Sequence, residues 1–220
     1  MKKLFIILMA ALFVLPMTSV STQLEAQNPF AKQLEKQRKK QFKSKMKEYQ
    51  KEGWKIFGST NSVEVALLEH YNELFEKGDK VYELVGIAAK FKSNAVGKQM
   101  ALNNACNTYA QSAKSFVQGR VTTEMGGDGV NAKQEFDNFY AAYERLVSSE
   151  IKGELKESYA IIRDLKDGTF EMQVYYVVDQ DRAAKIRESA MVQALKESQM
   201  AQEHAEQVSN FIREGFNEYQ

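Results

Sequence analysis

The sequence predicts an α+β fold: a small, largely antiparallel sheet of about four strands, long helices packed on one face, and N-terminal and C-terminal helical extensions. Apolar residues recur at helical spacing in several segments, and other segments alternate apolar and polar residues around turn signals. The only prolines are Pro16 and Pro29, so no proline-rich linker divides the chain. These observations favour one domain with extensions.

A hairpin is the clearest strand signal. Asp167-Gly168 is a strong turn dipeptide between two runs with strand composition. Along the second run the positions from Phe170 to Val178 alternate, which indicates one buried face and one partly hydrated face. The expected strands are residues 54–58, 81–91, 159–165 and 169–178.

The helices are recognised by apolar periodicity and by their end signals. Ser62 is among the N-cap candidates for the second helix, and Gly78 stops it. A glycine-rich loop is expected over residues 119–130. The last helix would run from Asp179 or Asp181 to about Glu218, a length of roughly 55 Å, so its second half should project or pair with the N-terminal helix. The expected helices are residues 29–51, 63–77, 94–118, 132–151 and 179–218.

Residues 1–26 have the order of a secretory signal peptide. A charged Met1-Lys2-Lys3 start precedes twelve apolar residues, 4–15, and a short polar stretch. Twelve apolar residues are too few to span a membrane. Cleavage is expected after Ala26, with 19–21 as an alternative site. The single cysteine, Cys106, lies far beyond this region, so no lipid-attachment cysteine follows it. A periplasmic or secreted protein without a transmembrane helix after cleavage is expected.

Charge divides the chain into a basic arm and an acidic body. Residues 28–55 carry ten basic and three acidic residues, a net charge of +7, whereas residues 56–220 carry 18 basic and 25 acidic residues, a net charge of −7. Composition predicts that the arm is a helix and the candidate interaction surface. Its candidate residues are Lys32, Lys36, Arg38, Lys39, Lys40, Lys43, Lys45 and Lys47.

Several partners could meet this arm. It could bind an envelope protein with an acidic surface, self-associate, or make peripheral contact with anionic lipid head groups. Alternatively, it could lie on the acidic body of its own chain or be solvated. Nucleic acid is disfavoured by the expected compartment and by the acidic body.

The sequence contains no recognisable catalytic, cofactor or metal-binding constellation. His70 and His204 have glutamate neighbours, but solvated helix faces explain such spacing better than a metal site. The glycines of residues 126–129 lack phosphate-loop spacing, and Asp179 with Asp181 lacks the rest of a calcium loop. Cys106 lies on an apolar helical stripe and is expected in the core.

Part of the chain resembles the LPP20 and flagellar assembly T N-terminal-like domains of bacterial envelope proteins. The resembling features are Val85-Gly86-Ile87-Ala88 in a strand, an alanine-rich helix around Ala105, and Tyr175-Tyr176-Val177-Val178 before a helix. The resemblance covers residues 54–195 and implies a structural or binding role without catalytic residues. We therefore expect four parts: the signal peptide (1–26), the basic arm (27–53), the LPP20-like domain (54–195) and the end of the last helix (196–220).

Two functions follow from these observations. The first is an exported, non-enzymatic envelope protein with a structural, assembly or interaction role. The second is an exported enzyme or small-ligand binder with its site between sheet and helices. The absence of a sequence constellation for catalysis favours the first.

Overall fold

The computed structural model describes residues 29–124, 130–203 and 205–214. The chain divides into two compact units, residues 1–39 and 40–220. The predicted signal peptide, the glycines of 126–129 and His204 lie outside the described residues. Among the described helices and strands, only the N-terminal helix α1 (Pro29–Glu52) crosses the boundary, and all the others belong to the second unit.

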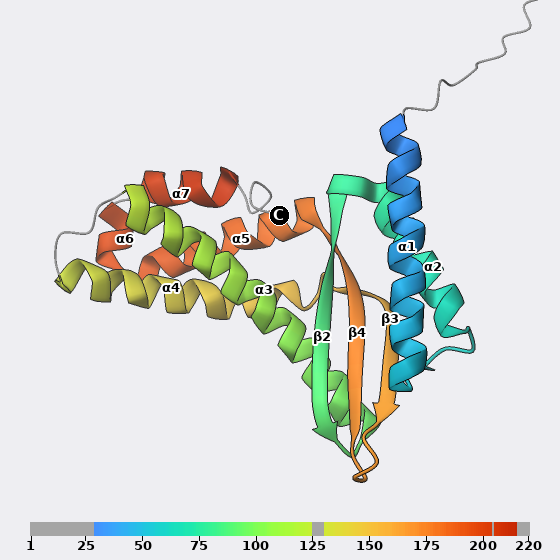
Figure 1. Ribbon diagram of the computed structural model, residues 1–220. Coiled ribbons are helices and arrows are strands. Elements are labelled where there is room, and N and C mark those ends of the chain that lie inside the picture. Colours follow the sequence, from blue (N-terminus) through green and yellow to red (C-terminus); the bar gives the residue numbers. More distant parts are fainter. Residues whose placement is uncertain (1–28, 125–129, 204, 215–220) are drawn as a thin grey trace, which may run out of the picture. The chain divides into compact units, whose positions relative to one another are not determined.

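The helices and strands follow one another in the order that the sequence predicts up to the last helix (Figure 1). The helices are α1 (Pro29–Glu52), α2 (Val63–Lys77), α3 (Asn94–Glu124), α4 (Val130–Ile151), α5 (Gln180–Ala194), α6 (Gln199–Glu203) and α7 (Ala205–Glu214). The strands are β1 (Lys55–Phe57), β2 (Val81–Phe91), β3 (Lys156–Asp164) and β4 (Phe170–Asp179). Two short 3-10 helices, η1 (Gly78–Lys80) and η2 (Leu195–Glu197), follow α2 and α5. Helix α3 therefore continues into the segment that was expected to be a loop.

The strands form one antiparallel sheet in the order β1-β3-β4-β2. The predicted hairpin joins β3 to β4, and both Lys166 and Gly168 adopt positive φ in its turn. Glycine takes this conformation without steric cost, which explains the turn signal in the sequence. The α+β class and the four-stranded antiparallel sheet are confirmed.

The long helices cover one face of the sheet, as predicted. Helix α3 packs against β2 and β4, α4 packs on α3, and α5 packs on α4. The close approach of β2 and α3 depends on Gly86, since a Cβ there would lie 2.1 Å from the carbonyl oxygen of Ala101. Cys106 is buried in this layer, so its predicted core position is confirmed.

The opposite face of the sheet is covered as well, which the sequence did not predict. A separate apolar cluster joins α2 and the C-terminal part of α1 to β3 and β4. It forms because Tyr159, Ile161 and Tyr175 point to this side of their strands and are all buried. The face expected to be partly hydrated is therefore largely covered by two helices.

The expectation of one long C-terminal helix is wrong. Helix α5 ends at Ala194, and Ser198 adopts an extended backbone (φ −147°, ψ 119°) between η2 and α6. The Ser198 hydroxyl accepts a hydrogen bond from the amide of Ala201 at 3.1 Å and so caps the next helix. Helix α7 then packs against α3 and α5, burying Val208. The chain turns back because this burial outweighs the continuation of a mostly polar helix.

Candidate functional site

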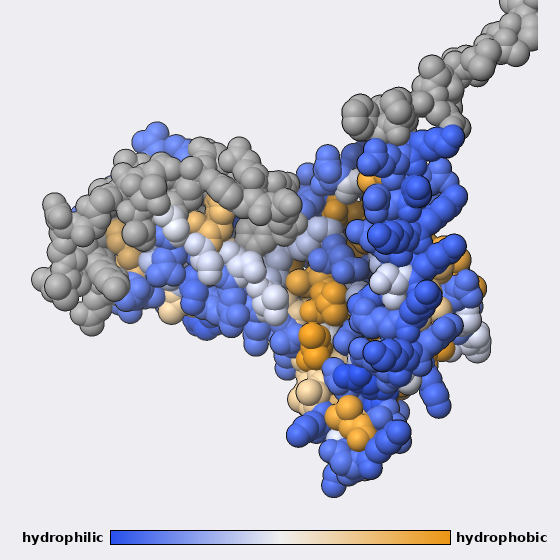
Figure 2. All heavy atoms as spheres, viewed as in Figure 1, coloured by the Kyte–Doolittle hydropathy of each residue, from blue (hydrophilic) through white to orange (hydrophobic). Residues whose placement is uncertain are grey.

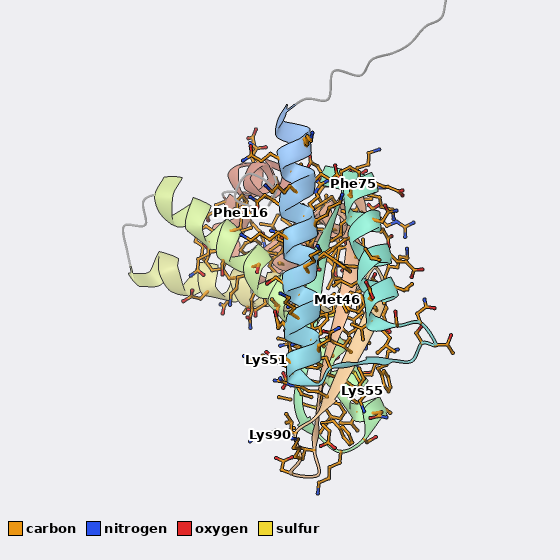
Figure 3. All side chains as sticks on the ribbon, turned by 45° about the vertical axis from the view of Figure 1, so that its right-hand side comes forward. Met46, Lys51, Lys55, Phe75, Lys90 and Phe116 are labelled. Carbon is orange, nitrogen blue, oxygen red and sulfur yellow. The ribbon has the colours of Figure 1, made fainter. Side chains whose placement is uncertain are left out.

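The C-terminal part of α1 is fixed to the sheet by three apolar side chains on one face of the helix. Phe42, Met46 and Tyr49 follow one another at spacings of four and three residues, which places them on the same side. Tyr49 is only 1% exposed, and Met46 lies on the side of α1 toward the strands (Figure 3). This part of the basic arm is therefore integrated into the body of the protein.

The hydroxyl of Tyr49 lies at the centre of a buried polar relay. It donates a hydrogen bond to the hydroxyl of Tyr175 at 2.8 Å and lies 3.1 Å from the hydroxyl of Tyr159. Tyr175 in turn donates to Oε1 of Gln173 at 2.9 Å. The rings of Tyr159 and Tyr175 stack with centroids 4.3 Å apart. The relay sets the position of α1 across two neighbouring strands, because each hydroxyl has a specific partner.

Burial disfavours ionisation of these three hydroxyls. Desolvation raises the pKa of Tyr49, Tyr159 and Tyr175 above the usual range of tyrosine. None of them therefore supplies a phenolate near neutral pH. The cluster suits a structural role better than acid–base catalysis.

The end of α1 is held by a second contact, centred on Arg163 of β3. Its guanidinium bonds to the carboxylates of Glu52 at 2.6 Å and Glu171 at 2.8 Å. It also lies over the ring of Trp54, 4.5 Å from the centroid. A guanidinium suits this arrangement because it can stack on an aromatic ring while its edges donate hydrogen bonds.

With this side fixed, four of the five lysines of α1 in the second unit face solvent. Lys40, Lys43, Lys47 and Lys51 are all exposed and follow one another at spacings of three, four and four residues, so they share one helix face. We call these four residues the lysine face. The exposed surface of α1 is accordingly hydrophilic (Figure 2).

The other candidates of the predicted surface differ in their surroundings. Lys45 is half-buried, bonds to Glu48 at 2.9 Å and lies over the ring of Tyr49. Lys32, Lys36, Arg38 and Lys39 belong to the first unit, where they are exposed. Lys39 pairs with Glu35 at 2.6 Å. Lys45 thus differs from its neighbours, because it lies on the side of α1 that packs toward the sheet.

Helix α2 presents an apolar stripe to solvent, which the sequence reading did not single out. Val65, Leu68 and Phe75 are 41%, 50% and 59% exposed (Figure 3 labels Phe75). Their spacings of three and seven residues place them on one side of the helix, opposite the buried Leu67 and His70. We call these three residues the α2 stripe. The exposed residues Glu64, Glu69 and Glu76 lie along its two margins.

His70 is the largest departure from expectation at this site. We predicted a solvated helix face, but its side chain is 0% exposed. Its Nδ1 lies 2.9 Å from Oγ of Ser158, and its Nε2 lies 2.5 Å from Oε2 of Glu83. The expected glutamate neighbours play no part, because Glu73 instead binds Lys77 and Lys156.

A β-bulge brings Ser158 to this histidine. Glu157 pairs with Tyr176 and Tyr159 with Tyr175, which leaves Ser158 as the extra residue of β3. Such a bulge can turn a side chain toward the other face of the sheet. Here it directs the hydroxyl to α2, so that His70 links α2 to both β2 and β3.

Serine, histidine and glutamate in hydrogen-bonded series are also the residue types of a hydrolase triad. In such a triad the histidine passes its proton to the leaving group of the substrate, so it must be reachable. His70 is instead enclosed, with the rings of Tyr159 and Tyr175 at centroid distances of 5.2 and 5.9 Å. The geometry favours a polar connection between helix and sheet.

The rest of the described chain offers little that resembles a chemical site. Within residues 29–124, 130–203 and 205–214, no group of three His, Cys, Asp or Glu side chains could hold a metal ion. A shallow hollow of about 470 Å³ is lined by Asn138, Ala141, Ala142, Arg145 and Glu197. It lies on α4 and η2, away from the sheet, and Arg145 and Glu197 pair across it at 2.7 Å.

Neither the described helices nor comparisons with known proteins supply a further assignment. Among the helices described, none combines the length and the apolar character needed to cross a membrane. Comparison with protein-family models, with curated proteins and with solved structures gave no match. The site must therefore be interpreted from its own residues.

Proposed function

We propose that this protein is an exported, non-enzymatic component of the cell envelope with an assembly or protein-interaction role. The lysine face of α1 is its contact element, and an acidic protein surface is its partner. The resemblance to LPP20-like domains supports the same role, as does the export signal expected at residues 1–26. Release into the periplasm or the medium is part of this proposal.

One observation carries the proposal: α1 buries one side and exposes four lysines on another. Phe42, Met46 and Tyr49 fix the helix, so the lysine side chains project from a rigid support. A rigid support reduces the ordering entropy that binding would otherwise cost. Lysines clustered on one helix face also attract an acidic partner at long range and accelerate encounter.

Charge reversal of the lysine face tests this function. The variant Lys40→Glu, Lys43→Glu, Lys47→Glu, Lys51→Glu changes exposed residues only, so it should keep its fold. A matched control reverses four exposed lysines elsewhere, Lys92, Lys152, Lys185 and Lys196. Both variants have the same net charge, which isolates the effect of position.

The readout is carbodiimide cross-linking in intact cells, since this reagent joins lysine amines to neighbouring carboxylates. The wild-type protein and the control should give the same discrete adducts of higher mass, and the lysine-face variant should lose them. If all three proteins give identical adducts, the lysine face has no role in binding and the proposal is wrong.

The alternative function, a hydrolase, depends on the series Ser158, His70 and Glu83. A fluorophosphonate probe reacts with serines that are activated by such a series. The interaction proposal predicts no labelling of Ser158 in the folded protein, because His70 is enclosed. Labelling that is lost in Ser158→Ala would favour the enzyme instead.

A further inference from the structure

The α2 stripe is unusual for the surface of a soluble domain. Its three large apolar side chains are each more than 40% exposed, and they lie in line along a single helix. Scattered exposed apolar residues are normal, but an aligned group with a polar margin is typical of a docking surface. The margin here is acidic, formed by Glu64, Glu69 and Glu76.

The chemistry of this surface defines its partner. An apolar stripe between carboxylates fits a helix that offers lysines, because the lysine stems cover apolar surface while their ammonium groups reach the margins. The lysine face of α1 has that chemistry. It also has a similar length: Lys40 to Lys51 spans about 17 Å along a helix and Glu64 to Glu76 about 18 Å.

The spacing of the charges matches as well. Lys40 and Lys47 are separated by seven residues, as are Glu69 and Glu76. Seven residues correspond to about two helical turns, so both pairs lie along one side of their helices. Two lysines of one helix could therefore meet two glutamates of another at the same time.

We propose that the partner of the lysine face is a second copy of this chain, whose α2 stripe receives α1. The inference rests on the proposed function, because it names the acidic partner that the lysine face binds. Both helices cover the same face of the sheet in each copy. A two-fold axis between the copies would thus form the α1–α2 contact twice, which is the usual symmetry of a homodimer.

The proposal predicts a reversible dimer of the mature protein in sedimentation-velocity runs over a range of concentrations. The double variant Leu68→Glu, Phe75→Glu removes apolar surface and places like charges beside the glutamate margin. It should weaken dimerisation by roughly 30-fold or more, as for the loss of an interfacial hot spot. Both residues are at least half exposed, so the variant should fold normally.

Val96→Glu, Val192→Glu serves as the control, since these valines are also about half exposed but lie on α3 and α5. It should dimerise like the wild-type protein. Added salt should weaken the dimer because it screens the lysine–glutamate contacts. The unfolding curve of each variant, followed by Trp54 fluorescence, shows whether the fold is kept.

Cross-linking tests the arrangement itself. In a Cys106→Ala background, a mixture of the Lys43→Cys and Glu69→Cys proteins should form heterodimers with a short bismaleimide. A mixture of Lys185→Cys and Glu69→Cys should not, because Lys185 lies on α5.

The outcomes separate this inference from the proposed function. If the purified protein is a monomer while the lysine-face variant still loses its adducts in cells, the partner is a different protein. In that case the inference fails and the proposed function stands. A dimer that is unaffected by Leu68→Glu, Phe75→Glu also overturns the inference. If the lysine-face variant keeps both its adducts in cells and its dimer in solution, the inference and the proposed function are both wrong.

Discussion

The connection made by His70 can be tested through the free energy of unfolding. The substitution His70→Leu removes the hydrogen bonds to Ser158 and Glu83, and also the ring contacts with the strand residues Tyr159 and Tyr175. A neutral hydrogen bond contributes about 0.5–1.5 kcal/mol and one to a charged group about 1.5–3 kcal/mol. An aromatic contact adds about 0.5–1.5 kcal/mol. Because the Glu83 side chain is 35% exposed, its contribution belongs at the lower end, and the total with two aromatic contacts is about 3–6 kcal/mol.

A double-mutant cycle isolates the hydrogen bond from other effects of the substitution. Ser158→Ala should cost about 1 kcal/mol when His70 is present and close to nothing in the His70→Leu background. The difference between these two costs is the coupling of the pair. A parallel cycle with Glu83→Leu should give a coupling of at least the same size, because that bond is charge-assisted.

Urea unfolding provides the assay. Trp54 is the single tryptophan of the chain and is buried in the same cluster, so its fluorescence reports the unfolding of this layer. Far-UV circular dichroism should follow the same transition if unfolding is two-state. Additive effects of His70→Leu and Ser158→Ala, within about 0.3 kcal/mol, would refute the proposed connection.

Three further predictions concern other parts of the fold. Gly86→Ala should destabilise the fold by about 1–3 kcal/mol or more through overpacking, because the new Cβ would lie 2.1 Å from the carbonyl oxygen of Ala101. Gly119→Ala has open space and should instead stabilise α3 by up to about 1 kcal/mol. Equal urea midpoints for the two variants would contradict the steric argument. Burial raises the pKa of the Cys106 thiol, so this thiol should react with a thiol reagent no faster than the protein unfolds. Rapid labelling of Cys106 in native buffer would show that its surroundings are open to solvent. Two lysines hold the pKa of Glu73 below its ordinary value of 4.5, so the stabilisation from its ion pairs is complete above that pH and is lost as pH falls through the lowered value. The difference in unfolding free energy between wild type and Glu73→Gln should therefore shrink from pH ~6 to pH ~3. A difference that does not depend on pH would refute the ion pairs.

Local signals made much of the fold predictable. The Asp167-Gly168 turn, the Ser62 cap and the Gly78 stop all depend on a few neighbouring residues, and each lies where the structure has it. The Ser62 hydroxyl accepts a hydrogen bond from the amide of Val65 at 3.1 Å. Signals of this kind are readable because backbone preference decides them without distant contacts.

The features that were missed depend on tertiary contacts. Nothing near Ser198 prevents a continuous helix, and only the packing of the residues beyond it explains the break. His70 looked solvated because its sequence neighbours are acidic, yet its partners come from strands 13 and 88 residues away. Apolar residues on both faces of β3 and β4, including Ala160 and Ile161, were a signal for the second helical layer.

Lysine footprinting in intact cells tests the central claim most directly, namely that the lysine face is covered by a partner in the cell envelope. Brief acetylation, followed by mass spectrometry, would compare Lys40, Lys43, Lys47 and Lys51 with the control lysines Lys92, Lys152, Lys185 and Lys196. All eight are exposed in the isolated chain and should react similarly in dilute purified protein. In cells the lysine face should be protected and the control lysines should not. Equal acetylation of both sets in cells would contradict the account.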